Sequence, residues 1–126
     1  MNFWLALSAG FGFLAVLFGA AGAHMGGDQP EGAALRQFET GVRYQMWHGV
    51  ALLGVALRSA QDKEGQRLSL RIAGGAFSVG IVLFSGSLYA LSISGTSNWG
   101  FFTPIGGSFF LIGWLALFLN AFPRRK

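Results

Sequence analysis

The sequence contains no cysteine and very little charge. The absence of cysteine from all 126 residues excludes disulfide bonds, thiolate metal sites and cysteine nucleophiles. Charged residues make up only 11% of the chain, whereas a soluble domain usually carries about 25%. So little charge cannot cover a globular surface in water, and 52% of the residues are hydrophobic. The composition therefore predicts a protein that is embedded in lipid.

The basic residues do not indicate nucleic-acid binding. The net charge is +4, but the cations form short clusters between apolar runs rather than one basic face. This arrangement is typical of the charges that orient membrane helices. We expect membrane lipid as a partner and no nucleic acid.

Two long uncharged stretches dominate the sequence. Residues 3–23 carry no charge, and as a helix they extend about 31 Å, which matches the hydrocarbon thickness of a bilayer. Residues 72–122 also carry no charge, and their length suits two helices rather than one. Gly95 can end the first of these helices, and Thr103 before Pro104 is typical of an N-cap and a first helical position.

A more polar span lies between these stretches. Asp28 and Pro30 resemble a helix start, followed by an amphipathic segment and an apolar run that ends near Leu57. We therefore predict an all-α fold, a single membrane domain over residues 1–126 that is a bundle of four transmembrane helices. The predicted spans are residues 3–23, 41–58, 72–93 and 104–122, with a polar outer loop at 24–40 and a cytoplasmic loop at 59–71 that turns at Gly65.

The cations orient this bundle. Residues 58–71 contain four cations and residues 124–126 contain three, so seven of nine fall on the side that the termini share with the middle loop. Because lysine and arginine concentrate in cytoplasmic loops, both termini are expected in the cytoplasm.

Arg43, Gln45 and His48 stand at the outer start of the second span. Arg43 shares a helix face with Glu39, so it can pair with that residue or extend its side chain to the interface. Gln45 and His48 fall on another face and are expected to hydrogen-bond across the bundle, because an unpaired polar group in lipid is costly. For His48, a structural bond and a functional role both stay open.

No catalytic residue, metal site or cofactor is predicted. His24 closes the first span on the outer side, but a metal needs three or four ligands and the chain has two histidines, which are expected at different depths. Ser85 and Ser87 have no acidic residue after Glu64 to complete a catalytic triad. Their hydroxyls are expected to bond neighbouring helices, which small residues allow to approach closely. The packing positions predicted are Gly19, Gly22, Gly86, Gly106 and Gly107.

Several stretches resemble one protein family. They are "GAAGAH" at 19–24, "FETGVRYQMWHGVALL" at 38–53, "LFSGSLYAL" at 83–91 and "TPIGG" at 103–107, followed by "GW" at 113–114. In order and spacing they are similar to the DUF423 family of small bacterial inner-membrane proteins, also called UPF0382. The resemblance covers nearly the whole chain. It implies four transmembrane helices and a plasma-membrane location, and it implies no activity because the family has none assigned.

The polar positions in these motifs converge on the outer half of the predicted bundle. They form a candidate polar cluster of His24, Arg43, Tyr44, Gln45, His48, Ser85, Ser87, Tyr89 and Thr103. The first hypothesis is a non-enzymatic membrane protein whose cluster stabilises the bundle or binds a lipid headgroup, a small anion or a partner, aided by free N–H groups at the start of the fourth helix. An alternative is a subunit of a homo-oligomeric transporter or channel for ions or small solutes. A second alternative is a membrane redox or enzyme subunit.

Overall fold

The computed structural model describes residues 1–25, 32–62 and 67–122, apart from the side chains of His24 and Met25. Within these ranges the chain forms helices and no strand. The elements are α1 (Phe3–Met25), α2 (Ala33–Gln61), α3 (Leu68–Gly80), the π-helical turn η1 (Ile81–Ser85), α4 (Gly86–Ser94), the 3-10 turn η2 (Ser97–Phe101) and α5 (Phe102–Asn120). The helix start predicted at Asp28 and Pro30 and the turn predicted at Gly65 lie outside the described residues.

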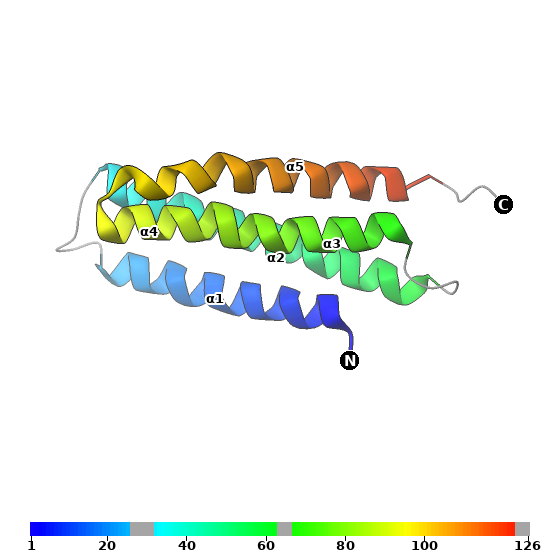
Figure 1. Ribbon diagram of the computed structural model, residues 1–126. Coiled ribbons are helices and arrows are strands. Elements are labelled where there is room, and N and C mark those ends of the chain that lie inside the picture. The colour runs from blue at the N-terminus through cyan, green and yellow to red at the C-terminus, as the bar shows by residue number, and fades with distance from the viewer. Residues whose placement is uncertain (26–31, 63–66, 123–126) are drawn as a thin grey trace.

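These elements form four long rods, because α3, η1 and α4 are continuous and η2 leads directly into α5. The rods lie side by side along a common direction, with α1 and α5 at opposite edges (Figure 1). α1 packs mainly against α2, and α5 packs against α3 and η1. The start of α1, the end of α2, the start of α3 and the end of α5 all lie at one end of the bundle (Figure 1).

The break between the third and fourth rods is partly as the sequence predicts. Gly95 ends α4 in the left-handed conformation, with φ of 72°, and its N–H donates to the carbonyl of Leu91. The predicted N-cap at Thr103 is wrong. α5 begins at Phe102, whose N–H already bonds the carbonyl of Trp99 in η2. Because the 3-10 turn supplies the backbone partners, Thr103 is free to use its hydroxyl elsewhere.

Three of the rods are long and apolar enough to cross a membrane by length and composition: Phe3–Ala23, Leu68–Ser94 and Ser97–Asn120. α2 has 29 residues but does not reach this hydropathy. The reason is its polar content, since it carries charges at both ends and buried polar side chains in its middle. The described chain therefore has four long helices, of which three meet the criterion for a span.

The exterior of the bundle is apolar, and some polar side chains are buried inside it. Phe13 on α1 is 70% exposed and Leu111 on α5 is 73% exposed, and many other large apolar side chains also lie on the surface. The buried polar side chains are Ser8, Gln45, His48, Ser85, Ser87 and Asn120. A contiguous apolar surface over this much of a small protein is unfavourable in water and is what a bilayer requires.

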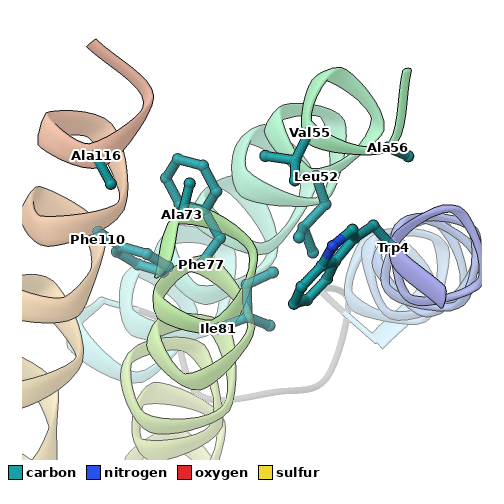
Figure 2. Close-up of a cluster of buried hydrophobic side chains, with 9 residues drawn as sticks. All are labelled: Trp4, Leu52, Val55, Ala56, Ala73, Phe77, Ile81, Phe110 and Ala116. Carbon is teal, nitrogen blue, oxygen red and sulfur yellow. The ribbon is translucent and has the colours of Figure 1, made fainter. Parts of the chain in front are cut away.

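The apolar core lies mainly between α2, α3 and α5 (Figure 2). Phe77 of α3 is fully buried at its centre, and Trp4 reaches in from α1 (Figure 2). Trp4 lies over Gly74, where an added Cβ would come within 2.7 Å of the indole ring. Trp4 thereby brings α1 into contact with α3.

Candidate functional site

Gln45 connects three helices. Its side chain is 3% exposed. Its Nε2 donates to the carbonyl of Phe11 on α1 at 2.9 Å, and its Oε1 accepts from the hydroxyl of Tyr89 on α4 at 2.6 Å. Both ends of the amide are thus engaged inside the bundle, and Gln45 holds α1 and α4 onto α2.

Serine and threonine hydroxyls make further connections between helices. Ser85 in η1 donates to the carbonyl of Gly41 on α2 at 2.7 Å, and Ser8 on α1 donates to the carbonyl of Gly49 on α2 at 2.8 Å. Ser87 on α4 lies 2.6 Å from the hydroxyl oxygen of Thr103 on α5. Each bond satisfies a buried polar atom where water is absent.

His48 makes a polar contact between α2 and α5. Its Nδ1 lies 2.8 Å from the carbonyl of Tyr44, and its Nε2 lies 3.0 Å from Nε1 of Trp114. A carbonyl only accepts and an indole N–H only donates, so the two contacts together require the neutral imidazole with its proton on Nδ1. The ring also stacks on Phe110, with centroids 3.6 Å apart. Neither nitrogen is left for a ligand.

A groove of about 810 Å³ opens beside this pair. α2 and α5 form its walls and Phe84 of η1 contributes to its lining. Its lining residues are Tyr44, Trp47, His48, Val50, Phe84, Pro104, Gly107, Ser108, Phe110, Leu111 and Trp114. Most of this surface is aromatic or aliphatic, and the volume is in the range of small-molecule sites. A π-helical turn often marks a functional position in a helix, and here it lies beside the groove.

The α2 wall of the groove carries two hydrogen-bond donors. Tyr44 and Trp47 line it, and within the described chain neither the Tyr44 hydroxyl nor the Trp47 indole N–H has a hydrogen-bond partner. Arg43 directly precedes Tyr44 and is exposed on the same helix stripe as Trp47. On the α5 wall, Leu111 is apolar and the indole N–H of Trp114 already donates to His48.

The structure divides the predicted polar cluster into separate contacts. Gln45 and Tyr89 bond each other, Ser87 and Thr103 bond each other, and Ser85 bonds the backbone of α2. Two further members of the cluster, Tyr44 and His48, line the groove. Arg43 lies on the exposed face of α2. The side chain of His24 lies outside the described residues.

The predicted packing glycines also differ from one another. A Cβ at Gly106 would lie 2.3 Å from the backbone nitrogen of Phe84, and one at Gly22 would lie 2.8 Å from the ring of Phe38. At Gly19 the nearest atom would be a Val42 methyl carbon at 3.4 Å. The nearest atom at Gly107 would be a Phe84 ring carbon at 3.8 Å, and nothing lies within 4 Å at Gly86.

Sequence reasoning missed the second half of the site, which α5 supplies. Trp114 lies in the middle of a uniformly apolar helix, where its hydrophobic pattern gives no sign of a partner. One chemical argument was available. A buried indole N–H usually needs an acceptor, and His48 is an acceptor near the middle of another predicted span. Phe84 and Phe110 carried no signal at all.

The buried polar network, the apolar exterior and the four long helices define a multi-pass helical membrane protein. Over residues 18–107 the chain matches the family described as "Protein of unknown function (DUF423)". The chain belongs to this family, also named UPF0382, as its motifs indicate.

Relatives extend over almost the whole chain. It is 43% identical over 125 residues to the UPF0382 membrane protein of Haemophilus influenzae, with 99% of this chain and 98% of the relative covered. It is 36% identical over 127 positions to the UPF0382 inner membrane protein YgdD of Escherichia coli K12, with 99% and 93% covered. It is 41% identical over 122 residues to the UPF0382 membrane protein YwdK of Bacillus subtilis 168, with 96% and 97% covered. No solved structure matches the chain.

These similarities and the apolar helices locate the protein in the inner membrane as a multi-pass protein. The family is of unknown function, and no relative named above carries the name of an enzyme.

Proposed function

We propose that the protein is a non-enzymatic lipid-binding protein that holds one phospholipid acyl chain in the groove between α2 and α5. The observation that carries this proposal is that the groove combines apolar walls with hydrogen-bond donors that have no partner within the described chain. Its aromatic and aliphatic walls suit a hydrocarbon chain, and its unpaired donors at Tyr44 and Trp47 suit the ester and phosphate oxygens of the same molecule. Arg43 is placed to contact the headgroup.

The length of the groove supports an acyl chain as ligand. From Pro104 to Trp114 the lining follows α5 for about 15 Å. This distance is about half the hydrocarbon thickness of a bilayer, which is the depth that one leaflet's acyl chains occupy. The groove opens on the side of the bundle rather than along its axis, so a lipid can enter from the bilayer.

The proposal includes four spans with both termini in the cytoplasm. Beyond Arg43, α2 presents a continuous apolar surface of Trp47, Val50, Leu53 and Leu57 until Arg58. This pattern supports α2 as the fourth span, with its charges at the two interfaces. Three of the five arginines that the structure describes, Arg58, Arg67 and Arg71, belong to the end of α2 and the start of α3, which lie at the same bundle end as the start of α1 and the end of α5 (Figure 1). That end is therefore assigned to the cytoplasm.

A binding role fits the groove better than catalysis or transport. Its lining contains no carboxylate, and both nitrogens of its histidine are engaged. Gln45, which would line the path of a transporter, has both ends of its amide bonded within the bundle. A water-filled path would have to break these bonds.

Photocrosslinking tests the proposal. Purified protein is washed with detergent to remove bulk lipid, then exchanged with a phospholipid that carries a diazirine in its acyl chain. We expect crosslinks, mapped by mass spectrometry, on the groove residues of α2 and α5 rather than on the equally exposed Phe13 and Val16 of α1. In Gly107→Leu the added side chain occupies the groove, and the groove crosslinks should fall several-fold.

Gly54→Leu is the matched control. Gly54 is exposed on α2 outside the groove, and an added Cβ there meets nothing within 4 Å. It should leave the crosslinks unchanged. Equal labelling of α1 and the groove, or a Gly107→Leu variant that crosslinks like the wild type, would contradict the proposal.

A further inference from the structure

Two arginine side chains bond the same residue, Asn120, at the end of α5. Arg58, in the last turn of α2, donates from Nε to Oδ1 of Asn120 at 3.3 Å. Arg67, at the start of α3, donates from Nη1 to the carbonyl of the same Asn120 at 3.2 Å. Two guanidinium groups are thus held next to each other through one neutral residue at the end of α5.

This arrangement is built into the fold rather than formed by mobile surface side chains. Asn120 is 3% exposed, and its Nδ2 donates to Oγ of Ser69 at 2.9 Å. Arg67 is fixed a second time, because its Nη2 donates to the carbonyl of Phe122 at 3.0 Å. Cations near the last carbonyls of a helix also oppose its negative dipole end. The two guanidinium groups are therefore positioned before any ligand arrives.

The local charge is not balanced. Arg71 follows Arg67 by one helical turn and is exposed, which adds a third cation to the same end. Among the residues described at this end the only carboxylate is Asp62, whose Oδ2 accepts the backbone N–H of Arg67. Adjacent like charges repel, so an anion between them is favourable.

Arg58 has donors left for such an anion. Its Nε is used by Asn120, and within the described chain its two Nη groups have no hydrogen-bond partner. A guanidinium with two free amino groups matches two oxygens of a phosphate. The neighbouring apolar side chains indicate where that phosphate comes from. Leu57 and Leu68, adjacent in sequence to the two arginines, are 58% and 70% exposed, as expected beside acyl chains.

We propose that Arg58 and Arg67, supported by Arg71, hold the phosphate of an anionic phospholipid headgroup at this end of the bundle. The site is separate from the groove and does not depend on which leaflet it faces. Negative lipids attract basic groups near a membrane surface, and each such group contributes roughly fivefold to the affinity. The structure adds selectivity, because two of the three groups are fixed in place.

The test is a lipid competition. Wild-type protein and variants are reconstituted in nanodiscs of phosphatidylcholine with a minor fraction of phosphatidylglycerol, then released and examined by native mass spectrometry. We expect the wild type to retain phosphatidylglycerol in large excess over its share. Arg58→Gln and Arg71→Gln should each lower this enrichment by about fivefold, because each removes one charge. Arg58→Lys, which keeps the charge but not the Nε donor, should lose less.

Three comparisons make the result decisive. Arg36→Gln, at the other end of α2, should keep the wild-type enrichment. If Arg58→Gln fails to fold, Arg71→Gln decides alone, since its exposed side chain makes no bond to Asn120. Equal enrichment in Arg71→Gln, Arg58→Gln and Arg36→Gln would overturn the proposal. So would saturation by inorganic phosphate alone, measured as thermal stabilisation in detergent, because the site would then take a free anion.

Discussion

The buried hydrogen bonds of this bundle run from side chains to specific partners on other helices. Gln45, Ser85 and Ser8 each donate to a backbone carbonyl of another helix. In lipid no water is present to replace a lost partner, so each bond is stabilising mainly because its absence would leave a polar atom unpaired.

At the residue scale we predict unequal effects for the two tyrosines. Tyr89→Phe keeps the ring, which packs on Phe18 and Phe38, but removes the hydroxyl that bonds Gln45. The buried Oε1 of Gln45 is then unpaired, and we expect the free energy of unfolding to fall by about 1 kcal/mol. Equilibrium unfolding in mixed micelles measures this change.

Tyr44→Phe is the matched control, because the Tyr44 hydroxyl has no partner within the described chain. In lipid-free micelles it should change stability by much less than Tyr89→Phe does. A similar loss in both variants would show that the Tyr89 bond to Gln45 is not what stabilises the bundle.

At the scale of elements, α5 and the α3–η1 rod approach each other closely at glycines along one face. Added Cβ atoms at Gly80, Gly106 and Gly113 would each come closer than 2.7 Å to an atom of the facing rod. Gly106 and Gly113 are separated by two helical turns, so they lie on the same face of α5. The hydrophobic effect does not drive helices together in lipid, so van der Waals contacts between closely packed helices stabilise the bundle instead.

We predict that two adjacent glycines of α5 respond oppositely to the same change. Gly106→Ala places a methyl group 2.3 Å from the backbone nitrogen of Phe84, which cannot move aside without separating the rods. We expect a loss of about 1–3 kcal/mol. Gly107→Ala places its methyl group 3.8 Å from a flexible ring, an ordinary contact, and should be neutral or slightly stabilising.

Thermal unfolding of both variants in the same detergent tests the pair. The contact between the rods is the cause only if Gly106→Ala unfolds at a clearly lower temperature than Gly107→Ala. If the two variants behave alike, helix propensity or detergent contacts dominate at these positions instead.

At the scale of the whole molecule, charge and apolar surface are segregated along the bundle axis. The described arginines of one end, Arg58, Arg67 and Arg71, lie beyond the apolar exterior of the rods. The other end has Arg36 and Arg43 with Glu39 beside them. This asymmetry is what the positive-inside rule uses, so orientation is a property of the whole chain and not of any single helix.

The orientation can be measured by cysteine labelling, because the chain has no native cysteine. We predict that Asn98→Cys, in η2, reacts with an impermeant maleimide in intact spheroplasts. Gln61→Cys, at the end of α2, should react only after the membrane is permeabilised. Labelling of both positions from outside would mean that the rod between them, Leu68–Ser94, does not cross the membrane. A reversed pattern would mean that the orientation is inverted or that α2 does not cross.

The general architecture follows from sequence-level physics in most places. The uncharged lengths at residues 3–23 and 72–122 require helices, because only internal hydrogen bonds satisfy a backbone in lipid. Gly95 predicts the end of α4 because a left-handed residue there favours glycine. The N-cap predicted at Thr103 is wrong, because the sequence pattern does not show that η2 already supplies a backbone partner at the start of α5.

The pairing of side chains could not be predicted from the sequence. Periodicity places Gln45 and His48 on one inward face, about 60° apart. It does not tell which neighbours they meet, and in the structure Gln45 bonds Tyr89 whereas His48 bonds Trp114. The residues that meet them, Tyr89 and Trp114, are set by how far the rods are offset along their length. Asn120 went unnoticed for the same reason, because its role depends on two other helix ends.

By itself, the sequence determined the solvent, the helical architecture and the charge asymmetry, because these depend on the composition of contiguous segments. Only the tertiary structure decided that the polar residues form separate contacts, that α2 and α5 leave a groove, and that two arginines share Asn120. The physical reason is distance. Transfer to lipid depends on each segment alone, whereas a hydrogen bond or a groove depends on atoms a few ångströms apart from segments far apart in the chain.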